Sequence, residues 1–244
     1  MNKNRVEILG VGIDPVTMNE AVAFCEKQIV SRVPAEIITA NAEMIMQANT
    51  NPQLLKAMLN AALVIPDGAG VILAAKYFGL AIPERVAGYD LSQELLKLAA
   101  KKNFRVFFLG AAPGVANQAK TAAEAKYAGL QIVGVENGYF APNEQEAVIE
   151  AVTKAQPDIL LVALGVPRQE LWLEEHLQVL GVPVCIGVGG TFDVMAGIVK
   201  RAPLWMQRIH LEWAYRLIMQ PWRIIRMMNL PKFAFKVLIS KLNG

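Results

Sequence analysis

An acidic residue, Asp67, stands between the end of an apolar segment and the beginning of a helical one. The segment Leu63–Pro66 precedes it, and Gly68 and Gly70 follow it. A carboxylate at such a crowded, partly dry strand end can acquire a pKa suited to a general base, which accelerates a reaction by roughly 10²- to 10⁴-fold. The same position suits an N-cap of the following helix, and from position alone the cap is the preferred interpretation.

Other polar and glycine residues occupy equivalent positions after apolar segments. Thr39 and Asn41 could hydrogen-bond a sugar, or could end a strand and cap a helix. Gly189 and Gly190 would let a ligand approach the backbone closely, although glycines also end strands for steric reasons. Asp193 could accept hydrogen bonds from a base or a ribose, or could be an acidic residue at a helix N-terminus. Each of these candidates therefore has two interpretations.

A glycine-rich turn follows the apolar segment Phe104–Leu109. It contains Gly110, Pro113 and Gly114 and leads into a helical pattern, so its backbone could cradle a diphosphate at a helix N-terminus. The turn is neither G-x-G-x-x-G nor a Walker A sequence, and an ordinary tight βα turn explains it equally well.

The elements that must position these residues alternate between short apolar segments and amphipathic helical patterns. This alternation predicts an α/β protein with a Rossmann-like, largely parallel sheet flanked by helices. Ligands of such sheets bind beyond the carboxyl ends of the strands, where the candidates lie. The predicted strands are Val6–Ile13, Glu36–Ala40, Leu63–Pro66, Phe104–Leu109, Ile132–Val135, Asp158–Leu164 and Val182–Val188.

The C-terminal end differs from the rest of the chain in charge. Residues 200–244 hold nine of the 24 Lys and Arg but only one of the 21 Asp and Glu, so the preceding residues carry a net charge of −5. Aromatic residues, among them Trp205, Trp213, Trp222, Phe233 and Phe235, are interleaved with these bases. We therefore predict a catalytic domain over residues 1–198 and a basic amphipathic helical appendage over 199–244 that contacts an anionic membrane surface.

The composition also indicates the cellular compartment of the protein and excludes some classes of catalytic chemistry. Cys25 and Cys185 lie in apolar segments, which favours a reducing compartment, and the N-terminus lacks an apolar secretion signal. The expected location is cytoplasmic, peripheral on the inner face of the cell membrane. The sequence contains no H-E-x-x-H, C-x-x-C, G-x-S-x-G or D-x-D motif, so no metal and no other cofactor is predicted. No nucleic-acid partner is predicted, and a homo-oligomer is left open.

A string of short motifs spans nearly the whole chain and closely resembles the WecG/TagA/CpsF glycosyltransferases. Each motif is weak alone, but their order along the chain is specific. The motifs are Ile38–Asn41, Ile65–Gly68, Gly110–Gly114, Leu164–Glu170, Gly187–Asp193, Ala196-Gly197, Arg201–Pro203 and Leu211–Trp213, followed by Arg216, Pro221, Arg223 and Arg226.

The resemblance implies a metal-independent, inverting glycosyltransferase of wall teichoic acid linkage-unit synthesis. Its donor would be the UDP-sugar UDP-N-acetylmannosamine, and its acceptor the 4-hydroxyl of N-acetylglucosamine on undecaprenyl diphosphate, a polyprenyl diphosphate. The implied base is Asp67, which reverses the preference for a helix cap. The other implied pocket residues are Thr39, Asn41, Arg85 and Gln169, and the residues implied to hold the acceptor diphosphate are Arg216, Arg223 and Arg226.

Three alternatives remain open. A nicotinamide-dependent oxidoreductase is disfavoured, because the first strand runs from Gly10–Gly12 into Ile13–Pro15 rather than into a glycine-rich helix start. A non-catalytic nucleotide-binding module on the membrane would share the same sequence features. Within the family, a transferase of the uronic acid form, N-acetylmannosaminuronate, could differ by a single cationic contact.

Overall fold

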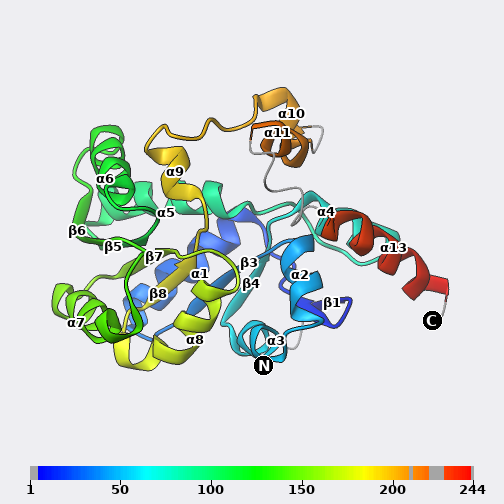
Figure 1. The fold of residues 1–244 in the computed structure, drawn as a ribbon, viewed down its shortest axis with the longest axis horizontal. Coiled ribbons are helices and arrows are strands. Elements are labelled where there is room, and N and C mark those ends of the chain that lie inside the picture. Colours follow the sequence, from blue (N-terminus) through cyan, green and yellow to red (C-terminus); the bar gives the residue numbers. More distant parts are fainter. Residues whose placement is uncertain (1–4, 209–210, 220–227, 243–244) are drawn as a thin grey trace.

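The fold is built on one parallel β-sheet. The computed structural model describes residues 5–208, 211–219 and 228–242 (Figure 1). Its six-stranded sheet has the order β4-β3-β8-β7-β5-β6, and every pair of neighbouring strands is parallel. The strands are β3 (Glu36–Ala40), β4 (Leu63–Pro66), β5 (Arg105–Gly110), β6 (Gln131–Glu136), β7 (Ile159–Ala163) and β8 (Val184–Gly187). The predicted α/β class is confirmed.

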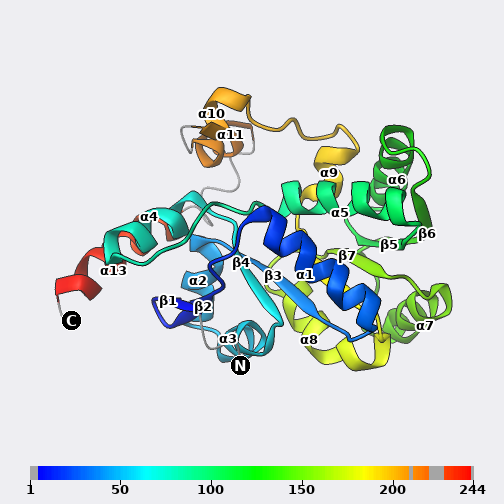
Figure 2. The ribbon, with the colours of Figure 1, turned by 180° about the vertical axis from the view of Figure 1, so that it is seen from behind.

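Helices cover both faces of this sheet, and β3, β4, β7 and β8 are therefore buried along their whole length. One face packs against α1 (Met18–Ser31), α5 (Gly88–Lys102), α6 (Val115–Lys126) and α9 (Thr191–Met195). The other face packs against α7 (Gln145–Ala155) and α8 (Arg168–Leu180), and a short 3₁₀ helix, η1 (Pro142–Glu144), precedes α7. Figures 1 and 2 show these layers from opposite sides.

A second cluster of apolar side chains lies beside β4, at one edge of the sheet. It is formed by α2 (Ala42–Ala48), α3 (Pro52–Asn60), α4 (Ala69–Phe78) and two short strands, β1 (Val6–Ile8) and β2 (Val11–Ile13). A helix from the C-terminal end of the chain, α13 (Asn229–Leu242), completes the cluster.

The single strand predicted over Val6–Ile13 is wrong. The chain turns at Leu9 and Gly10, whose φ angles are 50° and 81°, and β1 pairs antiparallel with β2 as a hairpin outside the main sheet. A two-residue turn with both φ angles positive matches the twist of a hairpin, but Leu at the first position hides the usual sequence signal. The buried Asp14 fixes the hairpin to the sheet, because its carboxylate accepts from Val64 N at 2.7 Å and from Arg5 Nε at 3.0 Å.

The strand order brings the first and last strands of the sheet together. Numbered along the chain, the six strands lie in the order 2-1-6-5-3-4, which differs from the 3-2-1-4-5-6 order of dinucleotide-binding domains. β3 and β8 are neighbours, so the loops that follow them leave the sheet side by side at its carboxyl edge. A ligand site is expected where such loops meet.

The C-terminal part of the chain also includes α10 (Leu204–Arg208) and α11 (Glu212–Met219). In both views α13 lies alongside α4 (Figures 1 and 2), and its Phe233 and Val237 are buried in the cluster that contains α2 and α4. The two predicted parts of the chain thus share a core, and the division at residue 198 stays a prediction. Within the described residues, no helix combines the length and apolar character needed to cross a bilayer.

The contribution of α13 to stability can be measured at two phenylalanines of the same helix. Phe233 is 4% exposed, whereas Phe235 is 65% exposed. We expect Phe233→Ala to lower the free energy of unfolding by about 3 kcal/mol, because it leaves a cavity among packed side chains. Phe235→Ala should change it by less than about 0.5 kcal/mol. Urea denaturation followed by circular dichroism decides, and equal effects of the two variants would contradict the packing described for α13.

Candidate active site

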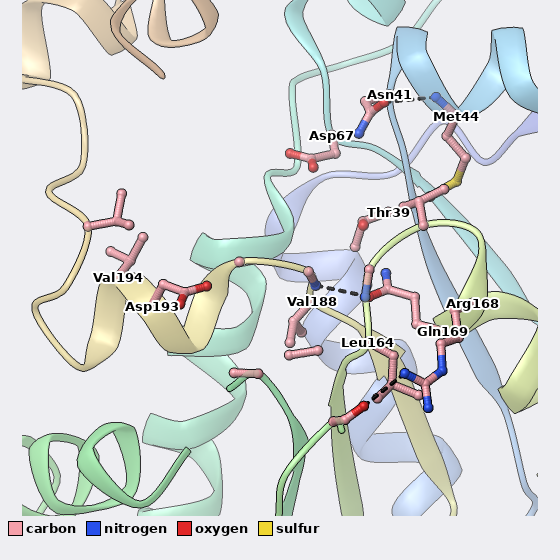
Figure 3. Close-up of a pocket in the computed structure, with 18 of the residues that line it drawn as sticks. Thr39, Asn41, Met44, Asp67, Leu164, Arg168, Gln169, Val188, Asp193 and Val194 are labelled. Carbon is pink, nitrogen blue, oxygen red and sulfur yellow. Dashed lines mark hydrogen bonds between the residues drawn. The ribbon is translucent and has the colours of Figure 1, made fainter. Parts of the chain in front are cut away.

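A cleft of about 690 Å³ lies at the carboxyl edge of the sheet, which is a volume typical of small-molecule sites. We call it the main cleft. Seven of the residues predicted from the sequence line it, and they come from the ends of β3 and β4, the loop after β8, and the helices α8 and α9 (Figure 3). These residues are Thr39, Asn41, Asp67, Gln169, Gly189, Gly190 and Asp193.

Asp67 is positioned by the backbone on both sides of it. Its N–H donates to the Ala40 carbonyl at 2.9 Å, and its own carbonyl accepts from Arg85 Nε at 2.6 Å. The carboxylate accepts from Gly88 N at 3.3 Å and is half-buried at the wall of the main cleft. The N-cap of α4 is Gly68, without any side-chain cap, so the interpretation of Asp67 as a helix cap is wrong.

Asn41 and Thr39 combine a structural role with a place in the main cleft. Asn41 Oδ1 accepts from Met44 N at 3.0 Å and caps α2, which leaves its amide N–H₂ group on the cleft side (Figure 3). Thr39 is 7% exposed, and its hydroxyl donates to the Gly187 carbonyl at 3.3 Å. The cap predicted for Asn41 is confirmed, and its predicted contact with a sugar remains compatible with this geometry.

Gln169 connects two of the loops that form the main cleft. Its side-chain oxygen accepts from Gly165 N at 3.1 Å and from Gly189 N at 3.2 Å. Its amide nitrogen donates to Glu170 Oε1 at 2.8 Å, and a Cβ at Gly187 would lie only 2.5 Å from that nitrogen. The side chain is 1% exposed, so this geometry gives Gln169 a positioning role in which it holds the loops after β7 and β8 at a fixed separation.

Arg85 lines a smaller cavity of about 60 Å³ that adjoins the main cleft and shares Thr39 and Asp67 with it. Besides its bond to the Asp67 carbonyl, Arg85 donates from Nη2 to Glu212 Oε2 at 3.0 Å. Glu212 is buried at the first residue of α11 and also lies 3.8 Å from Arg201 Nε. Arg85 therefore links the predicted base directly to the C-terminal part of the chain.

The glycine-rich turn after β5 reaches the main cleft through other residues than those predicted. Ala111 and Ala112 line the cleft, whereas Gly110, Pro113 and Gly114 are not among its lining residues. A Cβ at Gly110 would lie 2.4 Å from the Ala163 carbonyl oxygen, so close approach of β7 explains this glycine. The predicted role of the turn in holding a diphosphate stays a prediction.

Three cationic residues in the main cleft were given no role from the sequence: Arg168, Lys200 and Arg201. Arg168 donates to the Gly138 carbonyl at 2.8 Å and lies over the Phe140 ring. Arg201 lies over the Tyr89 ring and makes a bidentate ion pair with Asp90, which raises the pKa of the guanidinium against the opposing effect of burial. Arg168 directly follows the loop after β7 and could have been found by that signal, but the other two follow no strand.

The arginines predicted to hold the acceptor diphosphate cannot be placed. Arg216 belongs to α11, but its side chain lies outside the described part of the structure. Arg223 and Arg226 lie outside the described residues altogether. Their role therefore stays a prediction.

Two acidic side chains are buried behind the main cleft. Glu170 is 1% exposed, and burial raises the pKa of its carboxyl group to about 7, against the lowering effect of the hydrogen bond from Gln169. Glu36 is 2% exposed, and burial together with the nearby Glu170 and Glu174 raises its pKa well above the usual range. Both groups favour their neutral forms, which reduces the cost of burying them.

Comparison with known proteins places this arrangement in a family. The Glycosyl transferase WecG/TagA/CpsF family matches residues 6–244, and the chain belongs to this family. Three relatives carry the name N-acetylglucosaminyldiphosphoundecaprenol N-acetyl-beta-D-mannosaminyltransferase. The Bacillus subtilis (strain 168) protein is 36% identical over 223 residues, which are 91% of this chain and 86% of the relative. The Bacillus spizizenii protein is 39% identical, over 84% of this chain and 79% of the relative. The Staphylococcus aureus (strain MW2) protein is 33% identical, over 98% and 94%.

The raised pKa of Glu170 makes stability depend on pH. Its folded pKa of about 7 exceeds the ordinary value of 4.5, so its stabilising effect is complete below about pH 4.5 and is lost as the pH rises through about 7. The pKa difference corresponds to about 3 kcal/mol. Glu170→Gln keeps a carbonyl for Gln169 and cannot ionise, so its free energy of unfolding should fall less than that of the wild type between about pH 5 and about pH 8.

Denaturation curves at both pH values measure this difference. The exposed neighbour Glu175 provides a control, and Glu175→Gln should keep the wild-type dependence on pH. A Glu170→Gln variant that loses as much stability as the wild type over this range would contradict a neutral Glu170.

Proposed function

We propose that the chain transfers N-acetylmannosamine from UDP-N-acetylmannosamine to N-acetylglucosaminyl-diphosphoundecaprenol, in wall teichoic acid linkage-unit synthesis. The observation that carries this proposal is the position of Asp67. Its carboxylate lies at the wall of a cleft large enough for a nucleotide sugar and does not cap the helix that follows it. The activity printed in the names of the relatives supports the choice of substrates.

In the proposed reaction, Asp67 accepts the proton of the acceptor's 4-hydroxyl as that oxygen attacks the anomeric carbon of the donor. The bond between the anomeric carbon and the diphosphate oxygen breaks as the new bond forms, and UDP leaves with the electron pair. Attack opposite to the leaving group inverts the anomeric configuration. The hydrogen bond from Gly88 N and the bond between Arg85 and the Asp67 carbonyl hold the base in position.

The leaving diphosphate gains negative charge during the transfer. Cationic side chains along the main cleft, Lys200 and Arg168, lie where they can offset this charge, and Arg168 retains guanidinium N–H groups beyond those it uses for backbone carbonyls. We assign Asp193, on the opposite side of the main cleft from Asn41 (Figure 3), to hydrogen bonds with the nucleoside.

Contact with an anionic membrane surface would bring the protein to a lipid-linked acceptor. Lys232, Lys236 and Lys241 are exposed on α13, beside the exposed apolar side chains of Phe235 and Ile239. Each Lys near anionic lipid contributes about 1 kcal/mol of attraction, and apolar side chains add to it. The proposed state is therefore peripheral attachment at the cytoplasmic face.

A product assay combined with a measurement of UDP binding separates this proposal from the uronic acid transferase and from the non-catalytic module. A product assay with purified protein, a lipid-linked N-acetylglucosamine acceptor and both UDP-N-acetylmannosamine and its uronic acid form identifies the donor. Absence of transfer from every UDP-sugar, with UDP binding retained, would instead favour a non-catalytic binding module.

Removing the charge of Asp67 and removing the charge of Asp193 should change different kinetic parameters. Asp67→Asn should lower kcat by at least about 10²-fold with little change in the donor KM, because the amide cannot accept the hydroxyl proton but can still accept from Gly88 N. Asp193→Asn should mainly raise the donor KM. Steady-state kinetics of both variants provide the comparison, and an Asp67→Asn variant with more than about a tenth of the wild-type kcat would rule out the base assignment.

Transfer should continue when divalent metal ions are removed. This expectation rests on the lack of a D-x-D motif and on the cationic residues of the main cleft, which can offset charge on the diphosphate. Turnover measured with excess EDTA should remain within about twofold of the untreated rate, which corresponds to a change of less than about 0.5 kcal/mol in the activation free energy. A loss on chelation that Mg²⁺ or Mn²⁺ restores would contradict the prediction.

A further inference from the structure

A second hollow of the protein is separate from the main cleft, and the described residues that line it are all apolar. It has a volume of about 640 Å³ and lies between α2, α4, α11 and α13. Leu73, Trp213, Phe233 and Leu238 are among its walls, and Ala69 and Gly70 are at its head. We call this hollow the apolar groove.

The apolar groove begins two residues beyond the predicted base, Asp67. Its head residues, Ala69 and Gly70, directly follow the Asp67-Gly68 turn, and Ala42 of the groove directly follows Asn41 of the main cleft. A Cβ at Gly68 would lie 3.0 Å from Asn41 Cβ, so the two chain segments are in close contact at this point. The polar cleft and the apolar groove thus meet at the starts of α2 and α4.

From this head the apolar groove runs away from the main cleft along α4 and α13. Phe233, near the start of α13, lies against Gly70 at the start of α4, and Lys241, near the end of α13, donates to the Tyr77 carbonyl at the end of α4. The two helices therefore run side by side in the same direction. The part of α4 that lines the groove runs from Ala69 to Ala74 and gives a wall of about 9 Å.

Water is a poor occupant for such a surface. Leu73, Trp213, Met228 and Leu238 remain 59%, 45%, 54% and 50% exposed, although they border the same hollow. Covering apolar surface of this extent is favourable, and a concave shape fits a single chain of hydrocarbon better than a flat surface does. The lining residues carry no charge, so the occupant is expected to be uncharged along this length.

We propose that the apolar groove binds the isoprene units nearest the diphosphate of the acceptor. This inference rests on the proposed function, in which a polyprenyl diphosphate carries the accepting sugar. With the sugar hydroxyl at Asp67, the hydrocarbon has to leave the active site, and the groove offers an apolar path that begins beside this residue. Part of the acceptor's binding energy would then come from contacts with Leu73 and the walls of α13.

The test compares two acceptors in solution, N-acetylglucosamine linked through a diphosphate to a geranyl group or to an ethyl group. Both are used as dissolved molecules without detergent or vesicles, so a bilayer cannot contribute. The wild type should have a geranyl KM about tenfold below the ethyl KM, which is the effect of burying about one branched apolar group. Leu73→Asn should remove most of this preference without changing the donor KM or the kcat with the ethyl acceptor.

Leu59→Asn is the matched control, because Leu59 is 50% exposed on α3 and does not line the groove. It should keep the wild-type preference for geranyl. The inference would be overturned if the wild type showed no preference for geranyl, or if Leu73→Asn kept this preference as fully as Leu59→Asn does. Transfer to both acceptors would in either case uphold the proposed function. No transfer to either acceptor would contradict the proposed function instead.

If neither acceptor supports transfer, a binding measurement still tests the inference. A photoreactive geranyl diphosphate should label peptides of α4 and α13, and unlabelled geranyl diphosphate should compete with it. Labelling confined to other parts of the chain would overturn the inference. A Leu73→Asn variant that instead loses self-association in sedimentation, with geranyl labelling unchanged, would show that a second copy covers the groove.

Discussion

The parallel pairing of β3 with β8 is the constraint on which the site depends. Ile37 pairs with Ile186, so residues about 150 positions apart in the chain reach the same edge of the sheet. The hydrogen bond from the Thr39 hydroxyl to the Gly187 carbonyl continues this contact beyond the paired residues, toward the carboxyl edge of the sheet. Because every strand of the sheet points the same way, the loops after β3, β4, β7 and β8 all open on one cleft.

Gln169 extends this constraint from the strands to the loops. Parallel pairing fixes where β7 and β8 end, but it does not fix how the glycine-containing loops after them are spaced. A single buried side-chain oxygen that accepts from both Gly165 N and Gly189 N sets that spacing. The arrangement requires a buried partner for the amide nitrogen, which Glu170 provides, and a glycine at position 187, where a side chain would collide with the amide.

The sequence predicted much of this arrangement because the governing rules are local. Asp67 and Asn41 each follow a strand directly, and Gly189 lies two residues after β8. The rule that ligands bind at carboxyl ends places them together without knowledge of the strand order. The first strand was wrong because Leu9 adopts a positive φ that its residue type disfavours. The pattern of apolar residues along the chain does not reveal such a turn.

Contacts between segments that are distant in the chain could not be predicted from the sequence, for a different reason. Lys200 and Arg201 enter the main cleft from a segment that follows no strand, and their basic character was attributed to a membrane surface. Likewise, the apolar residues of α13 gave no indication which of them would pack on α4, because Phe233 and Phe235 differ only in the helix face they occupy. The charge of a segment predicts its surroundings in general, but the partner of a given residue depends on the tertiary fold.

A transferase that joins a nucleotide sugar to a lipid-linked sugar must bind one polar and one partly apolar substrate at the same carboxylate. The Asp67-Gly68 turn meets this requirement through its position in the fold, because it is both the end of a buried strand and the start of α4. On the strand side, the neighbouring strand ends supply polar groups, whereas on the helix side α4 presents small and apolar residues. The body of the chain cannot complete the apolar side alone, since α11 and α13 form its remaining walls. Arg85 bonds both the Asp67 carbonyl and Glu212, and it thereby links this turn to α11, one of the helices that line the apolar groove.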